Sequence, residues 1–122
     1  MAAEPAGLDA FFAGRPVSRQ LFEAVRVAVG AAGSSEIRVG RSQIAFRRCV
    51  GFAYAWVPGR YLRSDVPLVL TVALRRRDAS PRWKEVVEPR PGRFIHHLEL
   101  RETTEVDDVV RARIAEAWAL AG

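Results

Sequence analysis

Short apolar segments separated by turn residues fill the middle of the chain. Six of them, four to eight residues long, have the composition and alternation of strands: residues 36–39, 43–47, 52–57, 68–74, 83–87 and 94–101. The links between them are too short for the crossover helices that a parallel sheet requires. The pattern therefore predicts an antiparallel meander of five or six strands.

Helical patterns flank this region on both sides. Residues 6–13 and 18–32 carry apolar side chains at helical spacing, with Ser18 as the expected N-cap of the second helix. Thr104 is the expected N-cap of a final helix, and acidic residues follow it at the positive helix end. We predict an α+β fold in which N-terminal and C-terminal helices pack on one face of the sheet. The chain of 122 residues is expected to form a single domain, residues 1–122.

Cysteine content and hydropathy indicate the compartment. Cys49 is the only cysteine, so no intramolecular disulfide can form, which is typical of a reducing environment. The N-terminal residues lack the cationic start and apolar run of a signal peptide. The longest apolar run, residues 68–74, is far shorter than the ~20 residues that cross a bilayer. We expect a soluble cytoplasmic protein with no membrane partner.

Positive charge is concentrated in the middle of the chain. The net charge is +5, yet residues 38–93 hold 13 basic and 4 acidic residues, a net charge of +9. The two ends together hold 6 basic and 10 acidic residues. This distribution predicts a surface that attracts anions. The alternative is a set of solvated arginines at strand ends and in loops.

Several segments together resemble a known family. They are residues 8–16 (LDAFFAGRP), 42–48 (SQIAFRR), 80–89 (SPRWKEVVEP) and 91–100 (PGRFIHHLEL), with the acidic start of the last helix. They resemble the bacterial domain of unknown function 5655 in its short stand-alone form. The resemblance implies a compact α+β domain, sometimes fused to nuclease-like modules in longer relatives, some of which are labelled predicted transport proteins. It implies no activity and no catalytic residue.

The pair His96-His97 is the most conspicuous candidate for chemistry. Neighbours on a strand point to opposite faces, so the pair is not expected to chelate one metal ion. His96 shares its face with Phe94 and Leu98, which indicates either a histidine at the core edge or an acid–base group lining a pocket. His97 is expected at the surface. No zinc-ligand spacing is present, and neither a metal nor a cofactor is predicted.

Each of two basic segments can be interpreted as a functional site or as ordinary solvent-exposed surface. Lys84 is the only lysine, and it is either a functional ammonium or a surface partner of a nearby glutamate. Arg82 lies beside it. The run at residues 75–77 is expected to be solvated, and to contact phosphate only beside another basic loop. Residues 91–93 have the composition of a turn.

An aromatic stripe marks the predicted strand at residues 52–57. Phe52, Tyr54 and Trp56 alternate with small residues. On an exposed sheet such a stripe stacks bases while Arg47 meets phosphates. We instead expect the stripe to face the helices as part of the core.

These observations favour a non-catalytic binding module for an anionic partner, either a metabolite or nucleic acid. The expected ligand-binding residues are Arg47, Trp56, Arg82, Lys84 and His96. One alternative is a small enzyme with His96 as acid or base and Lys84 or Arg47 stabilising an anion. Another is a homodimerising structural domain. The sequence leaves monomer and homodimer open.

Overall fold

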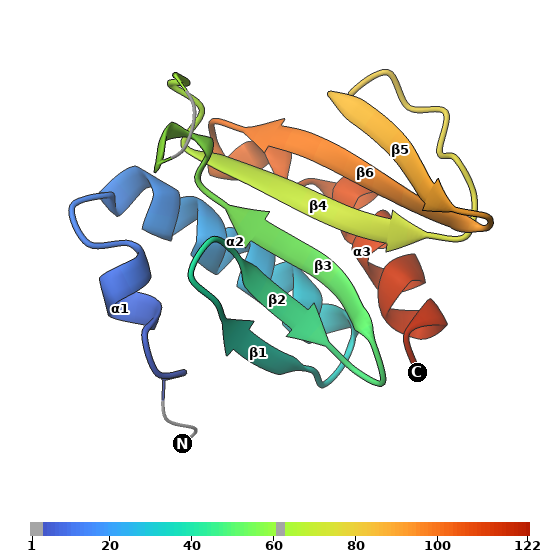
Figure 1. Cartoon of the computed structure of the whole chain (residues 1–122), viewed down its shortest axis with the longest axis horizontal. Helices are drawn as coiled ribbons and strands as arrows, with labels where there is room; N and C mark the ends of the chain where they lie inside the picture. Colours follow the sequence, from blue (N-terminus) through green and yellow to red (C-terminus); the bar gives the residue numbers. More distant parts are fainter. Residues whose placement is uncertain (1–3, 61–62) are drawn as a thin grey trace.

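The computed structural model describes residues 4–60 and 63–122 and confirms the α+β class (Figure 1). One antiparallel sheet of six strands is combined with N-terminal and C-terminal helices. The elements in chain order are α1 (Leu8–Phe11), α2 (Pro16–Ala32), β1 (Glu36–Val39), β2 (Ile44–Arg47), β3 (Gly51–Trp56), η1 (Pro58–Arg60), β4 (Leu68–Leu74), β5 (Glu85–Arg90), β6 (Arg93–Leu100), η2 (Thr103–Glu105) and α3 (Asp108–Leu120).

The strand order departs from a simple meander. The sheet runs β1-β2-β3-β4-β6-β5, so the last two strands exchange places relative to the chain. The link at residues 75–84 is long enough for the chain to pass over one strand position, so that β5 forms the edge of the sheet. β6 occupies the position between β4 and β5. β6 then pairs along the whole of β4, from Leu68–Leu100 to Leu74–Phe94. The expectation of a continuous meander was wrong at this point.

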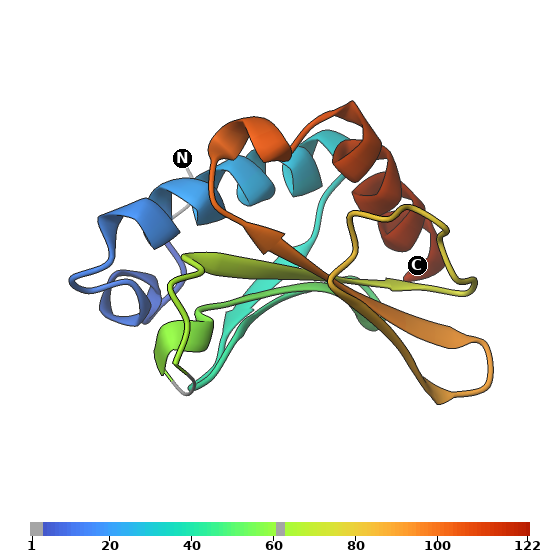
Figure 2. The same ribbon diagram turned by 90° about the horizontal axis from the view of Figure 1, so that it is seen from above.

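Helices cover one face of the sheet, as predicted. Figure 2 shows α2 and α3 above the curved sheet, with the opposite face left uncovered by either helix. The buried side chains of α2 recur at helical spacing: Ser18, Leu21, Phe22, Val25, Ala28 and Val29. They pack against inward side chains such as Ile44, Phe46 and Leu70, all fully buried. The uncovered side of the sheet is called the open face below.

Two helix starts differ from the sequence prediction. α2 begins at Pro16, because a proline needs no N–H partner in the first turn. Ser18 therefore lies inside the helix, and its hydroxyl donates to the carbonyl of Pro67 at 2.7 Å. Thr104 lies in η2, and the N-cap of α3 is Asp107, whose carboxylate accepts from the N–H of Val110 at 3.1 Å.

The aromatic stripe of β3 does not face the helices as a unit. Ala55 pairs with Leu70 on the helix-covered side, while Tyr54 and Trp56 lie half-buried on the open face. The expectation that the stripe is core was wrong for these two side chains. Phe52 is buried because a register shift in the pairing of β2 with β3 turns it toward the helices. Small residues permit the close approach of the helices at this strand.

Candidate functional site

A hollow opens where β3 and β4 separate. Their pairing stops at Ala53–Val72, although β4 continues to Leu74 beside β6. The gap forms a hollow of about 390 Å³, bounded by residues 49–52, 73–75, 90–93 and the C-terminal end of α3. The N–H of Cys49 donates to the carbonyl of Ala121 at 2.9 Å and joins two of these walls. We call this hollow the arginine cleft.

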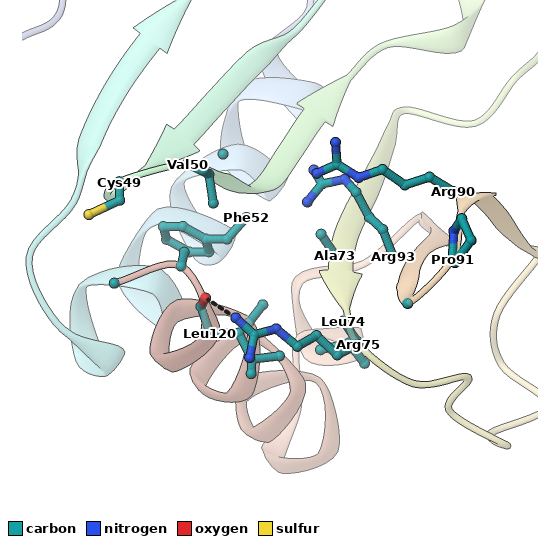
Figure 3. Close-up of a pocket in the computed structure, with 15 residues that line it drawn as sticks. Cys49, Val50, Phe52, Ala73, Leu74, Arg75, Arg90, Pro91, Arg93 and Leu120 are labelled. Atoms are coloured by element: carbon teal, nitrogen blue, oxygen red, sulfur yellow. Dashed lines mark hydrogen bonds between the residues drawn. The ribbon is translucent and has the colours of Figure 1, made fainter.

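Three arginines line the arginine cleft. Arg90 and Arg93 come from the turn between β5 and β6, and Arg75 follows the last residue of β4. In Figure 3 the guanidinium groups of Arg90 and Arg93 extend toward the hollow, and that of Arg75 lies beside Leu120 of α3. Arg75 Nη2 donates to the carbonyl of Leu120 at 3.4 Å.

The β5–β6 turn forces two of these cations together. Gly92 has φ +79°, a left-handed conformation that side-chain-bearing residues rarely adopt. Its N–H donates to a carboxylate oxygen of Glu88 at 3.1 Å, which fastens the turn. Arg90 is consequently directly opposite Arg93 in the ladder. Like charges in this position repel each other, so the arrangement is destabilising without a counterion.

The cleft carries an excess of basic side chains. Ion pairs between described residues hold eight other arginines: Arg19, Arg26, Arg38, Arg76, Arg82, Arg101, Arg111 and Arg113. Arg75, Arg90 and Arg93 take part in none of the ion pairs among the residues that the structure describes. Among the described residues that line the hollow there is no aspartate or glutamate, although the carboxylate of Glu88 bonds to the N–H of Gly92, a lining residue. The cleft is thus a local concentration of positive charge.

A second hollow lies on the open face. It measures about 470 Å³, and its floor and walls include Tyr54, Trp56, Thr71, Arg93 and His97. We call it the open-face basin. Thr71 Oγ1 and His97 Nδ1 are 2.8 Å apart. Burial lowers the pKa of His97, although the charge on Glu85 opposes this shift.

The sequence-predicted ligand residues are dispersed. Trp56 lines the open-face basin, and Arg47 is half-buried at the end of β2 on the same face. Arg82 is exposed and engaged, since it donates to Asp107 Oδ2 at 2.8 Å. Lys84 is exposed, and its backbone N–H donates to the carbonyl of His97 at 2.8 Å. These residues do not form one site.

His96 is fully buried in a satisfied hydrogen-bond arrangement. Its Nε2 accepts from the N–H of Asp78 at 2.9 Å, and its Nδ1 lies 3.2 Å from the carbonyl of Phe94. These partners define a neutral ring that donates from Nδ1. The Trp83 ring contacts it edge-on at 4.9 Å. Burial lowers the pKa of His96, and the residue lines neither the arginine cleft nor the open-face basin.

Asp78 anchors the same loop to α3. Its carboxylate accepts from Trp83 Nε1 at 2.8 Å, Arg113 Nε at 2.9 Å and Arg76 Nη1 at 3.1 Å. Burial alone would raise the pKa of Asp78, but the hydrogen bond from Trp83 and the charge of Arg113 outweigh it and lower the pKa. The surroundings of His96 are those of a structural tether and offer no opening for a substrate.

The arginines of the cleft were not among the predicted site residues. Residues 75–77 are expected to be solvated unless another basic loop lies beside them, and the pairing of β4 with β6 places Arg75 next to the turn at residues 90–93. The available signal was the order Arg-Pro-Gly-Arg, in which a tight turn puts two cations opposite each other. The third cation depends on the pairing of β4 with β6.

Within residues 4–60 and 63–122, no group of three or more His, Cys, Asp or Glu side chains is placed to hold a metal ion. In the same part of the chain, no helix combines the length and apolar character needed to cross a bilayer.

Comparison with known proteins gives a family and no activity. A family model described as a domain of unknown function, DUF5655, matches residues 8–121, which is nearly the whole chain. No curated protein and no solved structure matches.

Proposed function

The chain belongs to the DUF5655 family, whose description assigns no activity, and from its geometry we propose that it is a binding module for a small anionic ligand held in the arginine cleft. The observation that carries the proposal is that Arg75, Arg90 and Arg93 line one hollow, with no aspartate or glutamate among the described residues around it. A guanidinium group is planar and donates two parallel hydrogen bonds to a phosphate or carboxylate. An anion between Arg90 and Arg93 would relieve their cross-strand repulsion.

The size and walls of the cleft favour an organic anion. A hollow of about 390 Å³ lies in the range of small-molecule sites. Leu120 is half-buried and supplies apolar surface next to the cations, whereas Phe52 and Leu74 are almost fully buried beneath it. The ligand is therefore a small molecule with one strongly anionic group and a less polar body.

Binding without catalysis fits the residues of the cleft. Cys49 is the one lining side chain that is a common nucleophile, and no histidine, aspartate or glutamate lines the hollow to act as its base. His96, the candidate acid or base of the alternative enzyme, is closed off from both hollows. We also propose a cytoplasmic location, which the single cysteine of the chain supports.

Calorimetric titration with pyrophosphate and with ribose 5-phosphate tests the proposal. We expect saturable binding that weakens as salt is raised. Arg90→Gln removes one charge-assisted contact and is expected to weaken binding about tenfold or more. Arg38→Gln is the matched control, since it removes the same charge from an exposed arginine on β1, at the other edge of the sheet.

Two results would overturn the proposal. The first is the absence of binding by either anion at low salt. The second is an equal loss of affinity in Arg90→Gln and Arg38→Gln, because it would indicate general electrostatic attraction without a defined site.

A further inference from the structure

We infer that the ligand of the arginine cleft is a mononucleotide whose phosphate contacts the arginines and whose base enters the open-face basin. This inference rests on the proposed function and names its ligand class. Arg93 is the residue that joins the two hollows, because it lines both. A molecule bound through Arg93 has a cationic cleft on one side and an aromatic basin on the other.

Tyr54 marks the border between the hollows. Its hydroxyl oxygen accepts from Arg93 Nη2 at 3.4 Å. The same oxygen lies so close over Gly51 that a Cβ added there would be 2.3 Å away. Gly51 lines the cleft and Tyr54 lines the basin, so the contact between them lies at the boundary of the two hollows.

The basin has the surface that a planar base requires. Trp56 follows Tyr54 on the same face of β3, roughly 6.6 Å farther along the strand. Both rings are half-buried, so they are held in place and still present surface to a ligand. Aromatic side chains of this kind stack any of the bases. His97 and Gln43 add polar groups that can reach the edge of a stacked ring, and the buried Thr71 holds the His97 ring through the 2.8 Å contact of its hydroxyl with Nδ1.

The acidic residues of β5 and β6 on the open face favour one nucleotide over a longer strand that follows these strands. Glu85 is directly opposite His97 in the ladder, and Glu99 is directly opposite Val69, the neighbour of Trp56. Both carboxylates therefore lie on the open face beyond the basin. They would repel the next phosphate of an oligonucleotide, whereas a mononucleotide has its only phosphate at the cationic end.

The test compares ligands that share a phosphate and differ in the base. AMP and UMP are titrated calorimetrically beside ribose 5-phosphate, and tryptophan fluorescence is recorded. We expect the nucleotides to bind at least about tenfold more tightly than ribose 5-phosphate. Trp56→Leu should abolish this advantage, and a circular-dichroism spectrum and melting temperature close to those of the unmodified protein show that the variant is folded. Trp56→Phe, which keeps a stacking ring, should retain most of the advantage.

Each other outcome has a defined meaning. Equal affinity for AMP and ribose 5-phosphate would overturn the nucleotide inference and leave the anion-binding proposal standing. Absence of binding by all of these ligands would overturn both. Tighter binding of a 5′-phosphorylated oligothymidylate than of thymidine monophosphate would overturn the assignment to a mononucleotide. If Trp56→Leu still bound AMP and UMP more tightly than ribose 5-phosphate, the assignment of the base to the open-face basin would be wrong.

Discussion

Acidification is expected to destabilise this protein through a histidine that the fold keeps neutral. His96 is fully buried, and its two ring nitrogens are occupied by the N–H of Asp78 and the carbonyl of Phe94. Burial lowers its pKa from the ordinary value of 6.5. Below that value the unfolded chain binds a proton that the folded chain does not, so the free energy of unfolding falls as the pH falls.

The size of the effect follows from the linkage relation. The limit is set by a histidine that stays fully neutral in the folded state, which lowers the free energy of unfolding by about 1.4 kcal/mol between about pH 7.5 and about pH 5.5; the contribution of His96 is at most this amount. His97 has a pKa lowered in the same direction by burial, but it is half-buried and Glu85 opposes the shift. Its contribution is therefore smaller than that of His96.

Urea unfolding followed by tryptophan fluorescence at the two pH values measures this difference. His96→Gln keeps an amide donor and acceptor at the position, and it should lose most of the pH dependence while being less stable at neutral pH. His97→Gln is the control, and it should keep most of the pH dependence of the free energy of unfolding. A titration midpoint of the His96 ring above 6.5 in nuclear magnetic resonance spectra would refute the reasoning, as would an unchanged pH dependence in His96→Gln.

Three further predictions concern stability. Asp78→Ala should lower the free energy of unfolding by about 2–3 kcal/mol and the melting temperature by roughly 10 °C, because an indole and two guanidinium groups lose their acceptor; a shift within error in a thermal melt would contradict this. The Cβ of Gly30→Ala lies in open space on α2, so this variant should raise the free energy of unfolding by about 0.5 kcal/mol. Gly33→Ala places a Cβ 2.2 Å from the Trp118 ring and should lower the free energy of unfolding by about 1–3 kcal/mol. Urea unfolding should therefore show changes of opposite sign in the free energy of unfolding of the two variants. Asp107→Ala removes the N-cap of α3 and should cost about 1 kcal/mol in the same assay, and an unchanged value would argue against the capping bond.

Local patterns predicted most elements, with errors at their ends. The run at residues 68–74 is apolar on both faces, and it forms the buried strand β4 inside the sheet. The predicted start of the last helix at Thr104 was wrong because this segment contains two helix starts, each capped by acidic side chains. Glu102 and Glu105 form a capping box on the short η2, and Asp107 caps α3. A propensity for caps does not say which of several acidic residues will be used.

The sidedness of β3 shows a second limit. Alternation separates its aromatic from its small residues, but the period is the same whichever side faces the helices. The decision depends on the space between helix and sheet, where Ala53 and Ala55 permit close packing. The register shift that turns Phe52 inward belongs to the pairing of two strands and has no signature in one of them.

The local sequence pattern predicted the strands, the helices and an excess of positive charge in the middle of the chain, because side-chain period and net charge are local properties. It also set Arg90 and Arg93 at either end of a tight turn. Only the tertiary structure brought Arg75 to that turn, through the pairing of β4 with β6, and opened a hollow where β3 leaves β4. The meeting of these arginines at one hollow depends on contacts between segments that are distant in the chain. The energies of such contacts cannot be inferred from the composition of any one segment.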